Sequence, residues 1–62
     1  MGYNLKKARE AAGLTQEELA EKSGVKRGTI SNIETGKQTD MMVGNLKRIA
    51  EALGCEISDL VD

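Results

Sequence analysis

Glycine divides this chain at short intervals, and between the glycines apolar residues recur at the spacing of a helix. One segment shows this fully, because Leu46, Ile49, Ala50 and Leu53 stand at i, i+3, i+4 and i+7 and Gly54 follows directly. No segment alternates with the two-residue period of a strand. The pattern therefore predicts an all-α fold built from short helices.

Five helical segments are expected in a single domain, residues 1–62, which is close to the smallest size that folds alone. Because Tyr3 is the only aromatic residue, aliphatic side chains must form the core. The inward residues are expected to be Leu5, Ala8 and Ala12 in the first helix, Leu19, Ala20 and Ser23 in the second, Ile30 and Ile33 in the third, the four named above in the fourth, and Ile57, Leu60 and Val61 in a last short turn.

The second helix has a start signal in the run Thr15-Gln16-Glu17-Glu18. The Thr15 hydroxyl can accept from the amide of Glu18, whose carboxylate can reach back to the amide of Thr15. The third helix is expected to run from about Lys26 to Thr35, although a lysine cannot cap it. Because Gly24 lies just past the end of the second helix, only a tight connection separates the two helices.

The segment that begins at Gln16 has the residue spacing of a helix-turn-helix. Four of its residues define this spacing: Ala20, Gly24, Ile30 and Ile33. Two helices that cross at a steep angle need a small residue where their backbones approach and a glycine where the turn requires a positive φ. The two isoleucines would anchor the second of these helices in the core. Together, the small residue, the glycine and the two isoleucines predict a helix-turn-helix formed by the second and third helices.

With both isoleucines inward, the outward face of the third helix carries Arg27, Gly28, Ser31, Asn32 and Thr35. Arginine can bond bidentately to guanine, and asparagine to adenine, in the major groove of DNA. Although the whole chain has a formal charge of −1, residues 24–37 hold three basic residues and one acid, so the remainder carries −3. A basic edge on an acidic chain favours a polyanionic partner, double-stranded DNA.

The chain resembles the lambda repressor and Cro type of helix-turn-helix, the XRE family. The matching runs are GLTQEELAEKSGVKRGTISNIETGK and LKRIAEALGCEISDL, so that with the first helix the resemblance covers almost the whole chain. It implies a compact five-helix bundle whose third helix enters the major groove. It also implies a homodimer on a palindromic operator.

The resemblance assigns roles to nine residues. Arg27, Gly28 and Asn32 occupy base-contact positions, and Ser31 shares their face. Gln16 matches a helix-start glutamine that contacts phosphate and can touch a base, with a local helix-end role as the alternative. The residues expected to contact phosphate are Lys26, Thr29, Thr35 and Lys37.

Two charged residues, Arg9 and Glu34, point inward and therefore need partners. The family places a partly buried ion pair at these positions, so we expect Arg9 and Glu34 to pair. Cys55 is expected to be a small buried apolar residue. The apolar run Met41, Met42 and Val43 is expected to cover the core or to share in a dimer contact.

The functional prediction is a sequence-specific DNA-binding transcriptional regulator, most simply a repressor. An interaction module such as an antitoxin, or the DNA-binding fragment of a longer repressor, is the alternative. An enzyme is disfavoured because the chain lacks histidine and a nucleophile–base pair. No cofactor, metal or small-molecule substrate is expected.

A single cysteine favours a reducing compartment, and no apolar run reaches the roughly 18 residues of a membrane span. The expected location is the cytoplasm. Leu60 and Val61 are candidates for a homodimer contact that is weak or needs DNA.

Overall fold

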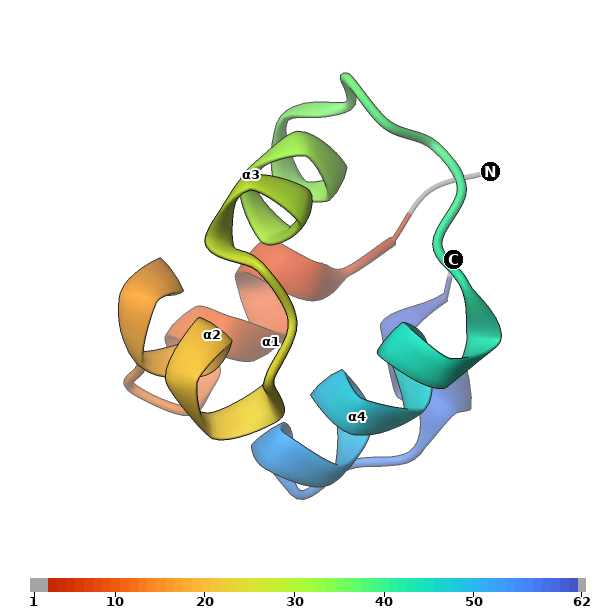
Figure 1. The fold of residues 1–62 in the computed structure, drawn as a ribbon. Helices are drawn as coiled ribbons and strands as arrows, with labels where there is room; N and C mark the ends of the chain where they lie inside the picture. Colours follow the sequence, from red (N-terminus) through yellow and green to blue (C-terminus); the bar gives the residue numbers. More distant parts are fainter. Residues whose placement is uncertain (1–2, 62) are drawn as a thin grey trace.

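The computed structural model describes residues 3–61 and shows four α-helices followed by a 3₁₀ turn (Figure 1). The elements are α1 (Leu5–Ala11), α2 (Gln16–Ser23), α3 (Arg27–Thr35), α4 (Val43–Leu53) and η1 (Ile57–Leu60). The all-α prediction and the order of five helical segments are confirmed. Within residues 3–61 the only extended pairing is an isolated antiparallel bridge between Tyr3 and Val61.

Each of the five elements contributes one fully buried side chain to a single core: Leu5, Leu19, Ile30, Ile49 and Leu60. Burial of one large aliphatic side chain stabilises a fold by about 1.5–3 kcal/mol. No element can therefore be removed without opening the core. This shared core holds α2 against both α3 and α4 and holds α1 against α3.

The turn between α2 and α3 depends on Gly24, which adopts a φ of 77°. Its amide donates to the carbonyl of Ala20 over 2.9 Å and so closes α2. An L-residue at this φ would be strained, which is the reason a glycine was expected here. Ala20 is half-buried, and the helix-turn-helix arrangement is confirmed.

Three apolar residues differ from the sequence-based expectations. Ala12 is exposed because α1 ends at Ala11. Met42 and Val43, expected to cover the core, are 76% and 75% exposed. Met42 is the N-cap of α4 and Val43 is its first residue, about one turn before Leu46, the first buried residue of that helix.

Two further expectations concern the end of the chain. Leu60 is fully buried and is hydrogen-bonded through its carbonyl to the amide of Asn4 over 2.9 Å, so its side chain is not free for a dimer contact. Cys55 is half-buried against the core, as expected, and burial raises the pKa of its thiol. A raised pKa leaves this thiol an unreactive packing group.

Candidate nucleic-acid interface

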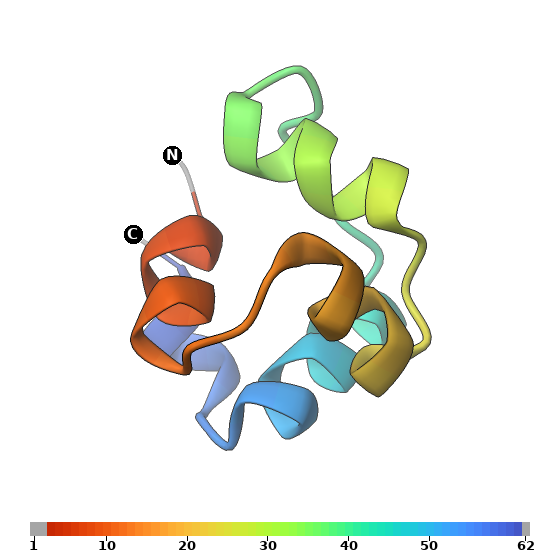
Figure 2. The same ribbon diagram turned by 90° about the vertical axis from the view of Figure 1, so that its left-hand side faces the viewer.

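Burial of Ile30 and Ile33 leaves the opposite side of α3 facing outward. Figure 2 looks onto this side of the molecule, where α3 crosses above the start of α2. The two helices therefore present a common surface. This surface includes the segment predicted to meet DNA.

All nine predicted DNA-binding residues retain exposed surface. Those classed as exposed are Lys26, Arg27, Gly28, Thr35 and Lys37, and those that are half-buried are Gln16, Thr29, Ser31 and Asn32. Gly28 has open space around the position of a Cβ atom, so no packing within the protein requires a glycine there. Its lack of a side chain leaves room above α3 for another molecule.

The Thr35 hydroxyl is already engaged within α3, where it donates to the carbonyl of Ser31 over 2.9 Å. A phosphate oxygen only accepts, so this hydroxyl must give up its internal bond before it can donate to DNA. The Asn32 side chain is different. Within residues 3–61 its amide group takes part in no hydrogen bond, whereas the backbone carbonyl of Asn32 accepts from the amide of Gln38 over 3.0 Å at the end of α3.

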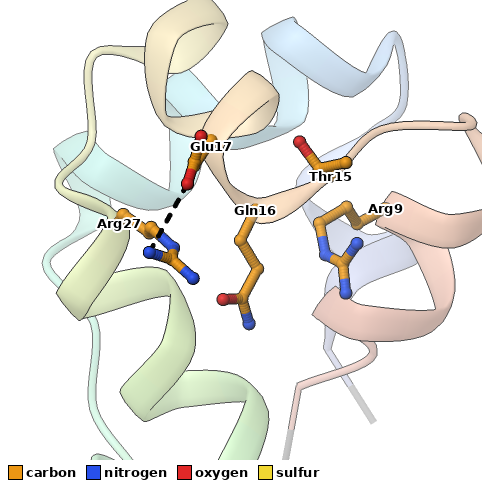
Figure 3. Close-up of a pocket in the computed structure, with 5 residues that line it drawn as sticks. All are labelled: Arg9, Thr15, Gln16, Glu17 and Arg27. Carbon is orange, nitrogen blue, oxygen red and sulfur yellow. Dashed lines mark ion pairs between the residues drawn. The ribbon is translucent and has the colours of Figure 1, made fainter.

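Arg27 lies near Glu17 at the start of α2, with 3.6 Å between the guanidinium and the carboxylate (Figure 3). The two side chains are 59% and 76% exposed, so this ion pair contributes little to stability. The pair spans the boundary between α2 and α3. An incoming anion must compete with Glu17 for Arg27.

The expected ion pair between Arg9 and Glu34 is confirmed, and it is nearly buried. Arg9 Nε and Nη2 donate to the carboxylate of Glu34 over 2.7 and 3.2 Å, and Nη1 donates to the carbonyl of Leu14 over 2.7 Å. The two side chains are only 11% and 2% exposed. The pair ties α1 to α3 beneath the outward surface.

The carboxylate of Glu34 also accepts a hydrogen bond from Gln16 Nε2 over 3.0 Å. Burial alone would raise the pKa of this carboxyl, but the hydrogen bonds from Arg9 and Gln16 together outweigh it and the pKa lies below its usual value. The pKa of Arg9 is raised, chiefly by its hydrogen bond to Glu34. No local sequence pattern predicts the contact between Gln16 and Glu34, because 18 positions separate the two residues.

The starts of α2 and α3 enclose a cleft lined by Arg9, Thr15, Gln16, Glu17 and Arg27 (Figure 3). Thr15 also belongs to the predicted capping box, which is confirmed: Glu18 N donates to Thr15 Oγ1 over 3.1 Å, and Thr15 N donates to Glu18 Oε1 over 2.9 Å. At the first turn of α3, Lys26 provides no side-chain cap, as expected. The cleft brings together the guanidinium groups of Arg9 and Arg27, the carboxylate of Glu17 and the amide of Gln16.

A protein-family model described as helix-turn-helix matches residues 5–60 of the chain. The chain belongs to the XRE-type helix-turn-helix family. Within residues 3–61, no helix has the length and hydropathy to cross a bilayer. The same residues contain no group of three or more His, Cys, Asp or Glu side chains that could hold a metal ion. The family consists of DNA-binding transcriptional regulators and not of enzymes.

Curated relatives share this classification. The helix-turn-helix transcriptional regulator SinR of Bacillus subtilis is 32% identical over 62 residues, which are 100% of this chain and 56% of SinR. A regulator from Methanothermobacter thermautotrophicus is 46% identical over 52 residues, 84% of this chain and 74% of the relative. The helix-turn-helix chain thus spans little more than half of SinR.

Two solved structures share the fold. SinR, the master regulator for biofilm formation, in complex with DNA superposes with a TM-score of 0.86 and 31% identity, covering 89% of this chain and 87% of that one. The restriction-modification controller protein C.AhdI of Aeromonas hydrophila gives a TM-score of 0.83 and 34% identity, covering 90% and 83%. The likeness therefore extends over nearly all of the helix-turn-helix domain.

Proposed function

We propose that the chain is a single DNA-binding domain that regulates transcription, most simply as a repressor, with α3 in the major groove of double-stranded DNA. The outward face of α3, opposite the buried Ile30 and Ile33, is the observation that carries this proposal. An α-helix fits the major groove, where each base pair has a distinct pattern of donors and acceptors. The fold of SinR solved with DNA supports the same use of this domain.

The residues divide by chemistry into those that read bases and those that hold the backbone. Arg27 and Asn32 are suited to guanine and adenine, and Ser31 lies on the same face. Gly28 lets α3 approach the base edges. The residues proposed to contact phosphate are Lys26, Thr29, Thr35, Lys37 and Gln16, the last of which can also touch a base.

A dimer would bind far more tightly than one copy, because one domain of this size buries only about 600–1,000 Å² on DNA. We infer a homodimer on a palindromic operator with half-sites about one helical turn, roughly 34 Å, apart. Since Leu60 is in the core, the half-buried Val61 and the exposed Met42 and Val43 remain as candidate contacts. The association is expected to be weak or to need DNA.

Selection of binding sites from a random duplex pool tests the proposal, followed by titration at several salt concentrations. Arg27→Ala should weaken binding to the selected site by about 1–3 kcal/mol and relax preference at one base position. Lys37→Ala should weaken all sequences alike and reduce the salt slope by about one unit. Lys47→Ala removes the same charge from α4, outside the proposed surface, and serves as the matched control.

An unchanged consensus for Arg27→Ala would remove that residue from base reading. Failure of the wild-type protein to bind any duplex at low salt would remove the DNA-binding function.

The exposed Met42 and Val43 favour a second candidate function, contact with another protein. An antitoxin, or a longer repressor with a partner-binding part, would use such a surface. A partner that stays bound after nuclease treatment, and is lost from Met42→Ser, would support this candidate. A regulator that reads DNA alone should retain none.

A further inference from the structure

The Glu34 carboxylate determines which way the side chain of Gln16 faces. It is only 2% exposed and accepts from Arg9 Nε, Arg9 Nη2 and Gln16 Nε2 over 2.7, 3.2 and 3.0 Å. An ionised carboxylate has no hydrogen to donate, so Gln16 must turn its NH₂ group, and not its oxygen, toward Glu34. The lowered pKa of Glu34 keeps this acceptor ionised near neutral pH.

The carbonyl oxygen of Gln16 then lies on the opposite side of the amide. In Figure 3 this oxygen faces the side of the cleft where Arg27 lies, and the nitrogen faces away from it. Gln16 is the first residue of α2 and Arg27 is the first residue of α3. The carbonyl oxygen of Gln16 and the guanidinium of Arg27 thus line the same cleft, one from the start of each helix.

We propose that Glu34 is a positioning residue for DNA recognition, which holds the Gln16 amide so that its carbonyl oxygen accompanies Arg27 at the major groove. The proposal rests on the DNA-binding function inferred above and gives the ion pair a role beyond stability. Arg9 takes part by holding both carboxylate oxygens: its Nε donates to Oε2, and its Nη2 donates to Oε1, the oxygen that also accepts from Gln16.

The orientation selects the chemistry that Gln16 can recognise. A phosphate group offers only acceptors, so the carbonyl oxygen of Gln16 finds no partner on the DNA backbone. The amino groups of adenine N6 and cytosine N4 are donors in the major groove and do match it. The oxygen of Gln16 therefore contributes to base preference, while its second N–H remains able to donate.

A double-mutant cycle separates this role from a structural one. Glu34→Gln, Gln16→Ala and the double variant are compared for affinity to the selected duplex and for base preference, at a temperature where circular dichroism shows each to be folded. Glu34→Gln alone should weaken binding roughly 3- to 30-fold and alter preference at the base position that Gln16→Ala also alters. In the Gln16→Ala background the same substitution should change affinity by less than about twofold.

A residue that acts only on stability would behave otherwise. Equal fold-changes of Glu34→Gln in both backgrounds, or a loss of affinity with the base preference unchanged, would overturn the proposal. Ile49→Val, which trims the α4 side of the core, is the control for lost stability alone and should leave the base preference intact. If the wild type binds no duplex, the DNA-binding function fails first, so the two failures are distinguishable.

Glu34→Gln leaves Arg9 without its charged partner and can therefore prevent folding. A second variant covers that case. Arg9→Met combined with Glu34→Leu removes both charges, an exchange that buried ion pairs often tolerate. This folded variant should alter preference at the Gln16-dependent position, and adding Gln16→Ala should alter it no further. An unchanged preference in the charge-free variant would overturn the proposal.

Discussion

Helices α2 and α4 begin in contrasting ways. At the start of α2, Thr15 and Glu18 satisfy each other's backbone amides, and Gln16 is hydrogen-bonded to the buried Glu34. At the start of α4, Met42 offers no side-chain hydrogen bond, Val43 is exposed and Gly44 occupies the first turn. The first turn of α2 is therefore fixed by side-chain hydrogen bonds, whereas the first turn of α4 has no side-chain cap.

This difference coincides with a difference in proposed use. The start of α2 belongs to the proposed DNA-binding surface, where side chains must be held in one geometry to read bases. The start of α4 lies outside the residues assigned to that surface and exposes apolar side chains instead. Low local stability is therefore expected at the first turn of α4 and high local stability at the first turn of α2.

The largest expected effect comes from the ion pair beneath the start of α2. Glu34→Ala should lower the free energy of unfolding by about 3–5 kcal/mol, because Arg9 keeps its charge and loses its partner. For a domain of this size that is a large part of the roughly 3–9 kcal/mol typically available. Urea unfolding followed by circular dichroism measures it.

Arg9→Met combined with Glu34→Leu is the control for this prediction and should lose far less stability than Glu34→Ala. A melting temperature of Glu34→Ala equal to that of the wild type would refute the structural role of the pair.

The next largest effect concerns the capping box. Thr15→Ala should cost about 1 kcal/mol, since the amide of Glu18 loses its acceptor. The same substitution at Thr39, an exposed residue of the loop before α4, should change stability by less than about 0.5 kcal/mol. Similar losses for the two variants would show that the cap contributes nothing to the rigidity of α2.

A gain of stability is expected at the other helix start. Met42→Ser should stabilise the domain by about 1 kcal/mol or less, because a serine hydroxyl can accept from the amide of Asn45 in the first turn of α4. Hydrogen exchange should show slower opening of this turn, with Met42→Ala as the matched control. If Met42→Ser unfolds earlier than Met42→Ala, then the methionine side chain itself stabilises the start of α4.

Acid should remove the stabilisation that Glu34 provides. The pKa of Glu34 is lower in the folded protein than the value of about 4.3 expected when unfolded, so the unfolded chain binds more protons in acid. The stability that Glu34 contributes is therefore complete above that value and is lost as the pH falls below it. Urea unfolding from about pH 6 to pH 3 should show a steeper decline for the wild type than for Arg9→Met/Glu34→Leu.

Local signals explain why much of this protein was predictable before its structure was known. Helical periodicity, the capping box of Thr15 and Glu18, and the glycine of the tight turn all act within a few residues of one another. The confirmed helix-turn-helix follows from such short-range rules. The Arg9–Glu34 pair came from the family resemblance and from the need of an inward charge for a partner.

Other features depend on which distant segments meet, and no short-range rule contains that information. Gln16 meets Glu34 because α2 and α3 pack against each other, which brings together two residues 18 positions apart. Met42 and Val43 look like core residues in the sequence, yet they lie before the first turn of α4 that reaches the core. Composition and spacing thus specify the helices and their breaks, whereas packing alone selects which apolar residues stay outside and which way Gln16 faces.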